Sequence, residues 1–159
     1  MLRSRGRGFS LIELLAAAAI VGILASVAVP VVETTVRRQK ERELRQALRD
    51  IRGAIDAWKA AAASGRIAVN EADSGYPPSL ADLSAGVEDQ TNKTGPRLYF
   101  LRRIPRDPFA PDASLPAADT WGKRSFDSPP DAPQEGDDVF DVYSRSSAAG
   151  LNGLPYREW

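Results

Sequence analysis

Two hydrophobic patterns follow each other along the first 63 residues and predict one long helix. Residues 9–32 form an almost unbroken apolar run, in which the charged side chain is Glu13. A run of about 20 apolar residues can cross a bilayer as a helix, so this part predicts a transmembrane half. In residues 33–63, large apolar side chains recur every three or four positions, at Leu44, Leu48, Ile51, Ile55 and Trp58. That spacing predicts an amphipathic half with one buried face.

The remaining residues, 64–159, are rich in Pro, Gly, Asp and Ser and contain only short apolar stretches. Residues 139–144, VFDVYS, are the best strand candidate, because β-branched and aromatic side chains follow one another. Residues 76–83 predict a turn and a short helix with Ser79 as its N-cap. We therefore predict an α+β fold, a long N-terminal helix packed on an antiparallel sheet of about three strands with long loops.

Composition removes several classes of function. The chain has no Cys and no His among its 159 residues, which excludes disulfides and thiolate metal sites and removes the commonest general base. No convergent catalytic set is visible, so we predict a protein that is not an enzyme. Lys plus Arg equals Asp plus Glu, at 21 each, and this balance gives no reason to expect nucleic-acid binding.

Charges near the apolar run bear on its orientation and on the role of Glu13. Arginines 3, 5 and 7 precede the run and favour a cytoplasmic N-terminus, whereas the basic residues that follow it, beginning at Arg37, oppose that orientation. A carboxylate at the centre of a membrane span costs about 2.5–3.5 kcal/mol, and less near an end. Glu13 is therefore a functional candidate by default.

The segment RGRG-FSLIELL, continuing into the apolar helix, resembles the type III signal sequence of type IV pilins and type II secretion pseudopilins. The resemblance implies that residues 1–8 are a leader, which a membrane peptidase removes between Gly8 and Phe9. It also implies N-methylation of the new Phe9 amine. The family's acidic residue falls on Glu13 and its helix-kinking proline on Pro30.

Charge pairing gives Glu13 a role in assembly. In a filament, the Phe9 ammonium of one subunit can meet the Glu13 carboxylate of another, which offsets the desolvation of both and fixes the axial register. The alternative is an ordinary signal anchor whose Glu13 snorkels to the headgroups. Pro30, with Gly22 before it, predicts either local unwinding on assembly or a simple kink.

Several short motifs after residue 75 narrow the resemblance. Their order, Tyr-Pro, Ile-Pro-x-Asp-Pro, Trp-Gly and Phe-Asp-Val-Tyr-Ser, is similar to that of the G-type, or major, pseudopilin of type II secretion. Members of that group bind calcium near the last motif, which implies Asp141 and Ser144 as ligands. Ala148 stands where a second Asp is expected, so Asn152 is the substitute donor in a shifted loop. The alternative is a calcium-free loop closed by an Asn-Gly turn and the Tyr156 and Trp159 rings, and no cofactor is required.

The function implied is structural. The precursor is expected in a bacterial inner membrane as a single-pass protein, with residues 64–159 in the periplasm. Mature subunits would form a homo-oligomeric pseudopilus that drives protein export, with minor pseudopilins, the inner-membrane assembly platform and the prepilin peptidase as partners. The first alternative is a type IV pilin for adhesion, motility or DNA uptake. The second is a membrane-anchored binding domain.

Two charged groups have simpler interpretations. The basic residues between 37 and 52 predict a solvated helix face, with anionic lipid or DNA, or acidic patches on neighbouring subunits, as other ligands. Glu41 and Arg45 are spaced as an i,i+4 pair. Glu135, Asp137 and Asp138 predict a solvated loop and not paired catalytic carboxylates, because no nucleophile with a base lies nearby in the sequence.

Overall fold

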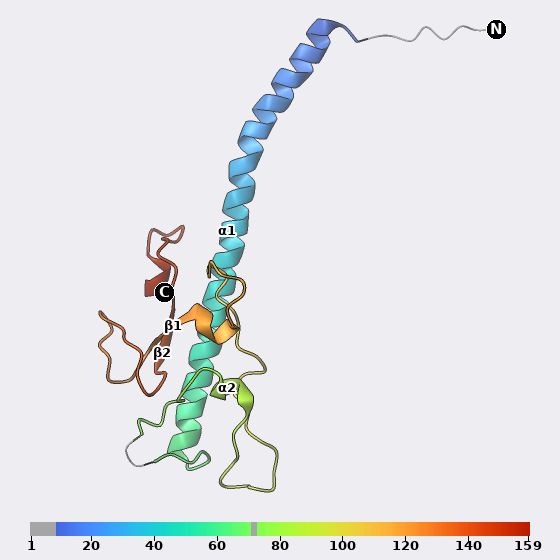
Figure 1. Cartoon of the computed structure of the whole chain (residues 1–159). Coiled ribbons are helices and arrows are strands. Elements are labelled where there is room, and N and C mark those ends of the chain that lie inside the picture. Colours follow the sequence, from blue (N-terminus) through green and yellow to red (C-terminus); the bar gives the residue numbers. More distant parts are fainter. Residues whose placement is uncertain (1–8, 71–72) are drawn as a thin grey trace, which may run out of the picture. The chain divides into compact units, whose positions relative to one another are not determined.

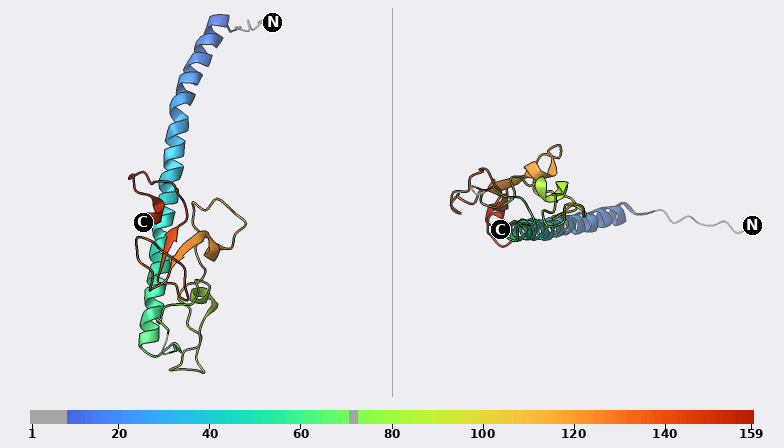
Figure 2. Two further views of the ribbon diagram at one scale, coloured as in Figure 1. Left: turned by 60° about the vertical axis from the view of Figure 1, so that its left-hand side comes forward. Right: turned by 90° about the horizontal axis from the view of Figure 1, so that it is seen from below.

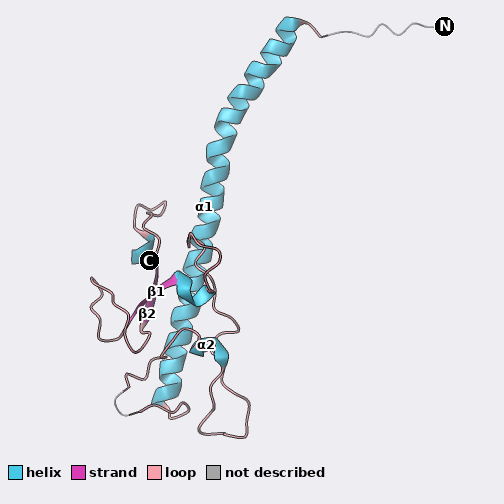
Figure 3. Ribbon diagram, viewed as in Figure 1, coloured by secondary structure: helices cyan, strands magenta, loops and turns pink. Residues whose placement is uncertain are grey.

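The computed structural model describes residues 9–70 and 73–159, and for residues 27–31 it describes the helical backbone and not the side chains. The elements follow in the order α1 (Leu11–Ala63), α2 (Asp82–Ala85), a 3₁₀ helix (Ala117–Thr120), β1 (Trp121–Arg124), β2 (Asp141–Ser144) and a second 3₁₀ helix (Tyr156–Glu158) (Figure 1). Loops make up most of the chain after α1 (Figure 3). One long helix followed by a small antiparallel sheet confirms the predicted fold class.

Helix α1 begins at Leu11 and ends at Ala63, close to both predicted ends. It continues through Gly22 and Pro30, so unwinding between these two residues stays a prediction about the assembled state. The side chain of Pro30 lies outside the described residues. By their contacts, the residues form two units, Met1–Gln39 and Lys40–Trp159.

In the described part of the first unit, apolar side chains are exposed on every side of the helix. The exposed fraction is 77% for Phe9 and Leu11 and still 64% for Leu24. The predicted membrane segment, residues 9–32, includes residues 27–31, whose side chains lie outside the description. Among the residues that are described, no helix combines the length and the hydropathy needed to cross a membrane.

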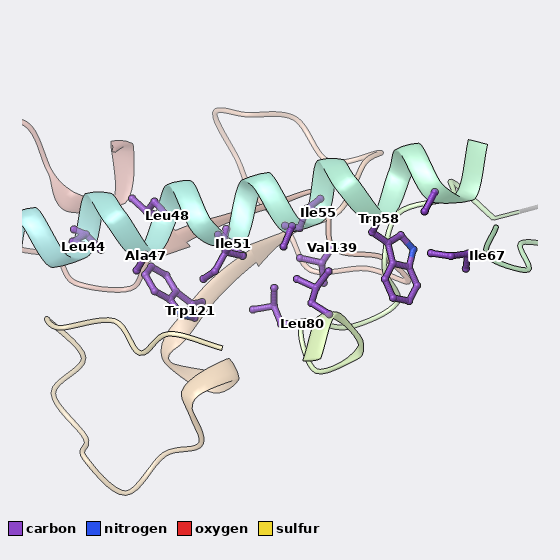
Figure 4. Packing of buried hydrophobic residues seen from close by; sticks show 14 of the residues in the cluster. Leu44, Ala47, Leu48, Ile51, Ile55, Trp58, Ile67, Leu80, Trp121 and Val139 are labelled. Carbon is purple, nitrogen blue, oxygen red and sulfur yellow. The ribbon is translucent and has the colours of Figure 1, made fainter. Parts of the chain in front are cut away.

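The second unit contains the hydrophobic core, and the predicted face of α1 forms one side of it (Figure 4). Its five predicted members are all buried, with exposed fractions of 5% or less: Leu44, Leu48, Ile51, Ile55 and Trp58. Leu80, Trp121 and Val139 from the later segments pack against them. Burial of each large apolar side chain contributes about 1.5–3 kcal/mol, so this face holds the loops on the helix. Two further views place those loops against one side of the second half of α1 (Figure 2).

The sheet is smaller than expected, since it has two strands where the sequence predicted about three. Strands β1 and β2 pair antiparallel, with Trp121 opposite Ser144 and Arg124 opposite Asp141. Gly122 lies beneath the ring of Tyr143, and a Cβ at Gly122 would approach that ring to 2.3 Å. The Trp-Gly motif therefore places a glycine where only a glycine fits. Every proline except Pro30 lies after residue 76, and proline limits further strand pairing.

The short helix predicted after residue 76 is present, but its predicted cap is wrong. Helix α2 begins at Asp82, and its N-cap is Ala81, whose side chain makes no capping hydrogen bond. The Ser79 hydroxyl instead donates to Asp82 Oδ2 at 2.8 Å, and the Ser79 backbone N–H donates to the same oxygen. The aspartate side chain thus closes a turn that precedes the helix.

A buried carboxylate ties the loop after α1 to the rest of the second unit. Asp89 Oδ2 accepts hydrogen bonds from Arg66 Nε at 3.0 Å and from the Arg66 terminal nitrogen at 2.6 Å. Its other oxygen accepts from the Thr91 hydroxyl and backbone N–H. Arg66 first, and Thr91 second, lower the pKa of Asp89 from the usual 3.8 to about 2.

This shift predicts a defined acid sensitivity. Because the folded pKa of Asp89 is lowered, its stabilising contribution is present above about pH 4 and is lost as the pH falls towards about 2. We expect Asp89→Asn to flatten the pH dependence of unfolding in that range. Urea unfolding of the full chain in detergent, followed at several pH values, measures it. An unchanged slope in the variant would contradict the prediction.

Candidate functional site

The N-terminal candidates lie at the start of α1. Phe9 lies two residues before the start of α1, is 77% exposed, and precedes Glu13 by four residues. The Ser10 backbone N–H donates to Glu13 Oε2 at 3.5 Å, the outer limit of a hydrogen bond. A carboxylate in the first turn also interacts favourably with the helix dipole. Glu13 is thus held weakly within its own chain and is exposed to other partners.

A single chain does not bring a second Phe9 to Glu13, so their pairing between subunits stays a prediction. Gly8, the residue before the predicted cleavage site, lies outside the described residues. What the structure adds is the surroundings of Glu13, where Phe9, Leu11 and Ile12 are each more than 70% exposed.

The residues predicted to bind calcium do not converge. Asp141 Oδ1 accepts a hydrogen bond from Arg52 Nε at 2.8 Å, and Asp141 Oδ2 lies 3.7 Å from Arg124. The Ser144 hydroxyl donates to Asp107 Oδ2 at 2.6 Å on the buried side of β2. Residues three apart on a strand point to opposite faces, so Asp141 and Ser144 cannot share an ion through their side chains. Asn152 Oδ1 accepts from the Leu154 backbone N–H in a separate turn.

A cationic side chain already occupies the space beside Asp141. The Arg52 guanidinium donates to the Asp141 carboxylate, to Val142 O at 3.1 Å and to Trp159 O at 2.9 Å. Calcium needs six to eight oxygen ligands, and these three oxygens already surround an organic cation. Across residues 9–70 and 73–159, no three acidic side chains are grouped to hold a metal ion. The residues present do not fit calcium.

Glu41 provides a second contact between α1 and the end of the chain. The sequence assigned Glu41 only to a surface pair with Arg45. Glu41 is 5% exposed, and its Oε1 accepts from the Leu151 N–H at 2.7 Å and from the Tyr156 hydroxyl at 3.0 Å. Arg45 places its guanidinium 4.3 Å from the centre of the Trp159 ring. Glu41 continues the Leu44–Leu48 spacing by three residues towards the N-terminus, and that was the available signal for its burial.

Aromatic rings complete the attachment of residues 150–159, the C-terminal segment. The rings of Tyr156 and Phe109 stack with their centres 4.0 Å apart, and Trp159 meets the edge of Tyr156 at 5.0 Å. The segment thus contacts α1 through an acid, Glu41, and a base, Arg52, that lie three helical turns apart. The sequence predicted a role for the Tyr156 and Trp159 rings in closing this segment. It did not predict the contacts that Glu41 and Arg52 make with it.

The Asp of the Ile-Pro-x-Asp-Pro motif has a structural task. Asp107 is 2% exposed, and its carboxylate accepts from the Ser144 hydroxyl and from the Phe109 N–H at 2.8 Å. Its own N–H donates to the Thr120 hydroxyl. Asp107 therefore joins the loop before β1 to the end of β2.

The carboxylates around residue 135 lie in an exposed loop, as the sequence indicated. Glu135 pairs with Arg145 at 2.9 Å. Asp138 accepts from the Phe126 N–H at 2.8 Å and from the Ser74 hydroxyl. These contacts hold the two ends of the loop, and Asp137 between them is exposed.

Comparisons with known proteins agree with this arrangement. Residues 3–29 match the family described as the prokaryotic N-terminal methylation motif. The type II secretion system core protein G of Dickeya chrysanthemi is 28% identical over 158 residues, which cover 96% of this chain and 95% of that protein. Its counterpart in Pectobacterium carotovorum subsp. carotovorum is 32% identical, covering 85% of this chain and 83% of that protein. The protein of that name in Klebsiella pneumoniae is 28% identical over 141 residues. No solved structure gives a significant match.

Proposed function

The chain belongs to the family of type II secretion system core protein G, the G-type pseudopilins, and from this we propose how its parts work together. As a pseudopilin it is a structural subunit that assembles into a pseudopilus. We propose that the precursor enters the inner membrane through residues 9–32, with residues 64–159 in the periplasm. Cleavage between Gly8 and Phe9 and methylation of Phe9 would then release a subunit able to assemble.

One observation supports this proposal above the others: a basic leader directly precedes a helix that is apolar all round. A helix with apolar side chains on every face needs an apolar environment on every face. Membrane lipid supplies it before assembly and neighbouring helices supply it afterwards. Phe9, Leu11 and Leu24 are exposed in the single chain, as a subunit awaiting such partners requires.

The filament would be attached to a secretion machine. We propose that minor pseudopilins, the inner-membrane assembly platform and the prepilin peptidase are its partners, and that its extension drives export of folded proteins. Deletion of the gene is then expected to leave normally secreted proteins in the periplasm, with surface filaments unchanged. Loss of long surface filaments with intact secretion would instead favour a type IV pilin. A deletion that produces neither effect would favour a membrane-anchored binding domain.

We also propose that the C-terminal segment is held by Glu41 and Arg52 and not by calcium. A calcium site filled at about a hundredfold its Kd would stabilise the protein by about 2.7 kcal/mol. We therefore expect the thermal unfolding midpoint of the full chain in detergent to be the same in EGTA and in excess calcium. A rise of several degrees on addition of calcium, absent with magnesium, would contradict this prediction.

A further inference from the structure

Three arginines form a straight row on the solvent side of α1. Arg42, Arg45 and Arg49 are exposed and are spaced three and four residues apart, which places them on one face of a helix. This arginine row lies away from the buried face of Leu44 and Ile51. At 100° per residue, the row deviates by about 30° to either side of a line along the helix.

In the part of the subunit that the structure describes, no carboxylate pairs with the arginine row. Arg49 donates to the Gln46 side chain at 2.6 Å, and Arg45 lies over the Trp159 ring. Among residues 9–70 and 73–159, no ion pair joins a carboxylate to Arg42, Arg45 or Arg49. An exposed row of unneutralised like charges favours contact with an acidic surface.

The same unit carries an acidic surface. Residues 127–138, the acidic loop, contain five acids and no basic residue. Asp127, Asp131 and Asp137 are exposed. The base of the loop is fixed by Asp138, which accepts from Phe126 N–H, and by Arg124, which donates to Ser128 O. The acids are therefore presented on a loop anchored to the sheet.

The arginine row and the acidic loop lie at different levels along α1. Asp131 lines a cleft of about 730 Å³ together with Arg52, which marks the level of the loop. Arg45, the middle of the row, precedes Arg52 by seven residues, or about 10 Å at a rise of 1.5 Å per residue. A second copy shifted along the helix by about that distance would bring its acidic loop to the level of this row.

We infer that the acidic loop of one subunit docks on the arginine row of the next. The contact joins two different surfaces and includes a shift along the helix, so it repeats without closing, as a filament requires. The net charge of the chain favours a second copy over anionic lipid as the partner. Without the three arginines of residues 1–8, the chain has 18 basic and 21 acidic residues and is net acidic. This inference rests on the proposed function, because it needs neighbouring subunits in a filament.

Charge reversal tests the contact. Arg42→Glu with Arg49→Glu, and separately Asp127→Lys with Asp131→Lys, are each expected to lower the yield of sedimentable filaments about fivefold or more through like-charge repulsion. The chain with all four changes is expected to recover to within about twofold of the unaltered protein, because the attraction is restored. Processing after Gly8 is measured in every variant by intact mass, since all four positions are distant from the leader in the sequence.

Cysteine crosslinking locates the contact, because the chain has no cysteine of its own. Cells expressing both an Arg49→Cys chain and a differently tagged Asp131→Cys chain are expected to give mixed disulfide dimers on mild oxidation. In the control, a Glu43→Cys chain replaces the Arg49→Cys chain. Glu43 lies on another face of α1, so the control is expected to give no mixed disulfide dimers.

The outcomes separate this contact from the proposed function. Filaments of unaltered yield after either reversal, or failure of the fourfold variant to recover, would overturn the contact alone. Mixed dimers in the Glu43→Cys control at the level of the Arg49→Cys pair would also overturn it. Processed chains that form no filament even without substitution would overturn the proposed function, and the contact with it.

Discussion

Replacement of Glu13 by alanine is expected to lower filament yield by about tenfold or more while leaving cleavage after Gly8 intact. In the single chain, Glu13 is exposed and makes one hydrogen bond, to Ser10 N–H at 3.5 Å. Its removal therefore costs the isolated subunit little. In the filament it would leave the Phe9 ammonium without a partner in an apolar interior, where an uncompensated charge is strongly unfavourable.

Pelleted filaments and N-terminal sequencing of the same preparation measure the two halves of this prediction. Glu33→Ala is the matched control, because Glu33 is an exposed acid at the other end of the apolar run on the same helix. Normal filament yield from Glu13→Ala would contradict the pairing. Loss of cleavage together with assembly would instead place Glu13 in recognition by the peptidase.

The second large effect is on stability, at Glu41. Alanine at this position is expected to lower the free energy of unfolding by about 2–4 kcal/mol, because two donors, one of them buried, lose their acceptor. The donors are Leu151 N–H and the Tyr156 hydroxyl, and Tyr156 is 1% exposed. Without them the C-terminal segment still has its aromatic contacts, those of Arg52, and the hydrogen bond from Tyr156 N–H to Ala148 O.

Urea unfolding of the full chain in detergent measures this loss. Glu41→Gln keeps an oxygen acceptor at the same reach and is expected to retain most of the stability. Asp56→Ala, an exposed acid on the same helix, is the control for removing a charge. Equal stability of the Glu41→Ala and Asp56→Ala variants would show that the two hydrogen bonds contribute nothing.

The parts of the fold that depend on local pattern could be predicted. The ends of α1 follow from hydrophobic periodicity, and the five apolar side chains of its buried face follow from a spacing of three and four. Strand β2 follows from a run of β-branched and aromatic residues, although it begins at Asp141, two residues later than expected. Each of these signals is local and can be recognised in a short window of the chain.

The contacts that attach the C-terminal segment could not be predicted in the same way. Glu41 and Tyr156 are 115 residues apart, and Arg52 and Asp141 are 89 apart. The loops between them, rich in proline and glycine, give no periodicity that fixes where their ends meet. The prediction of Ser79 as an N-cap was wrong for a different reason. Its hydroxyl and its N–H both donate to the Asp82 side chain.

The calcium prediction was carried from a resemblance and did not account for Arg52. Asp141 matched the family's strand motif, yet a ligand set also depends on what else lies beside the carboxylate. Here a guanidinium from α1 binds Asp141, Val142 O and Trp159 O. Arg52 lies one helical turn after Leu48. Nothing in the sequence around it indicates that its side chain contacts a strand residue 89 positions later.

Intact mass with N-terminal sequencing of the protein isolated from its own membranes tests the central claim most directly. The account predicts a mature chain that begins at Phe9 and carries one methyl group on its amine. A chain that retains residues 1–8, in cells whose prepilin peptidase processes other substrates, would contradict it. The apolar run would then serve only as an anchor.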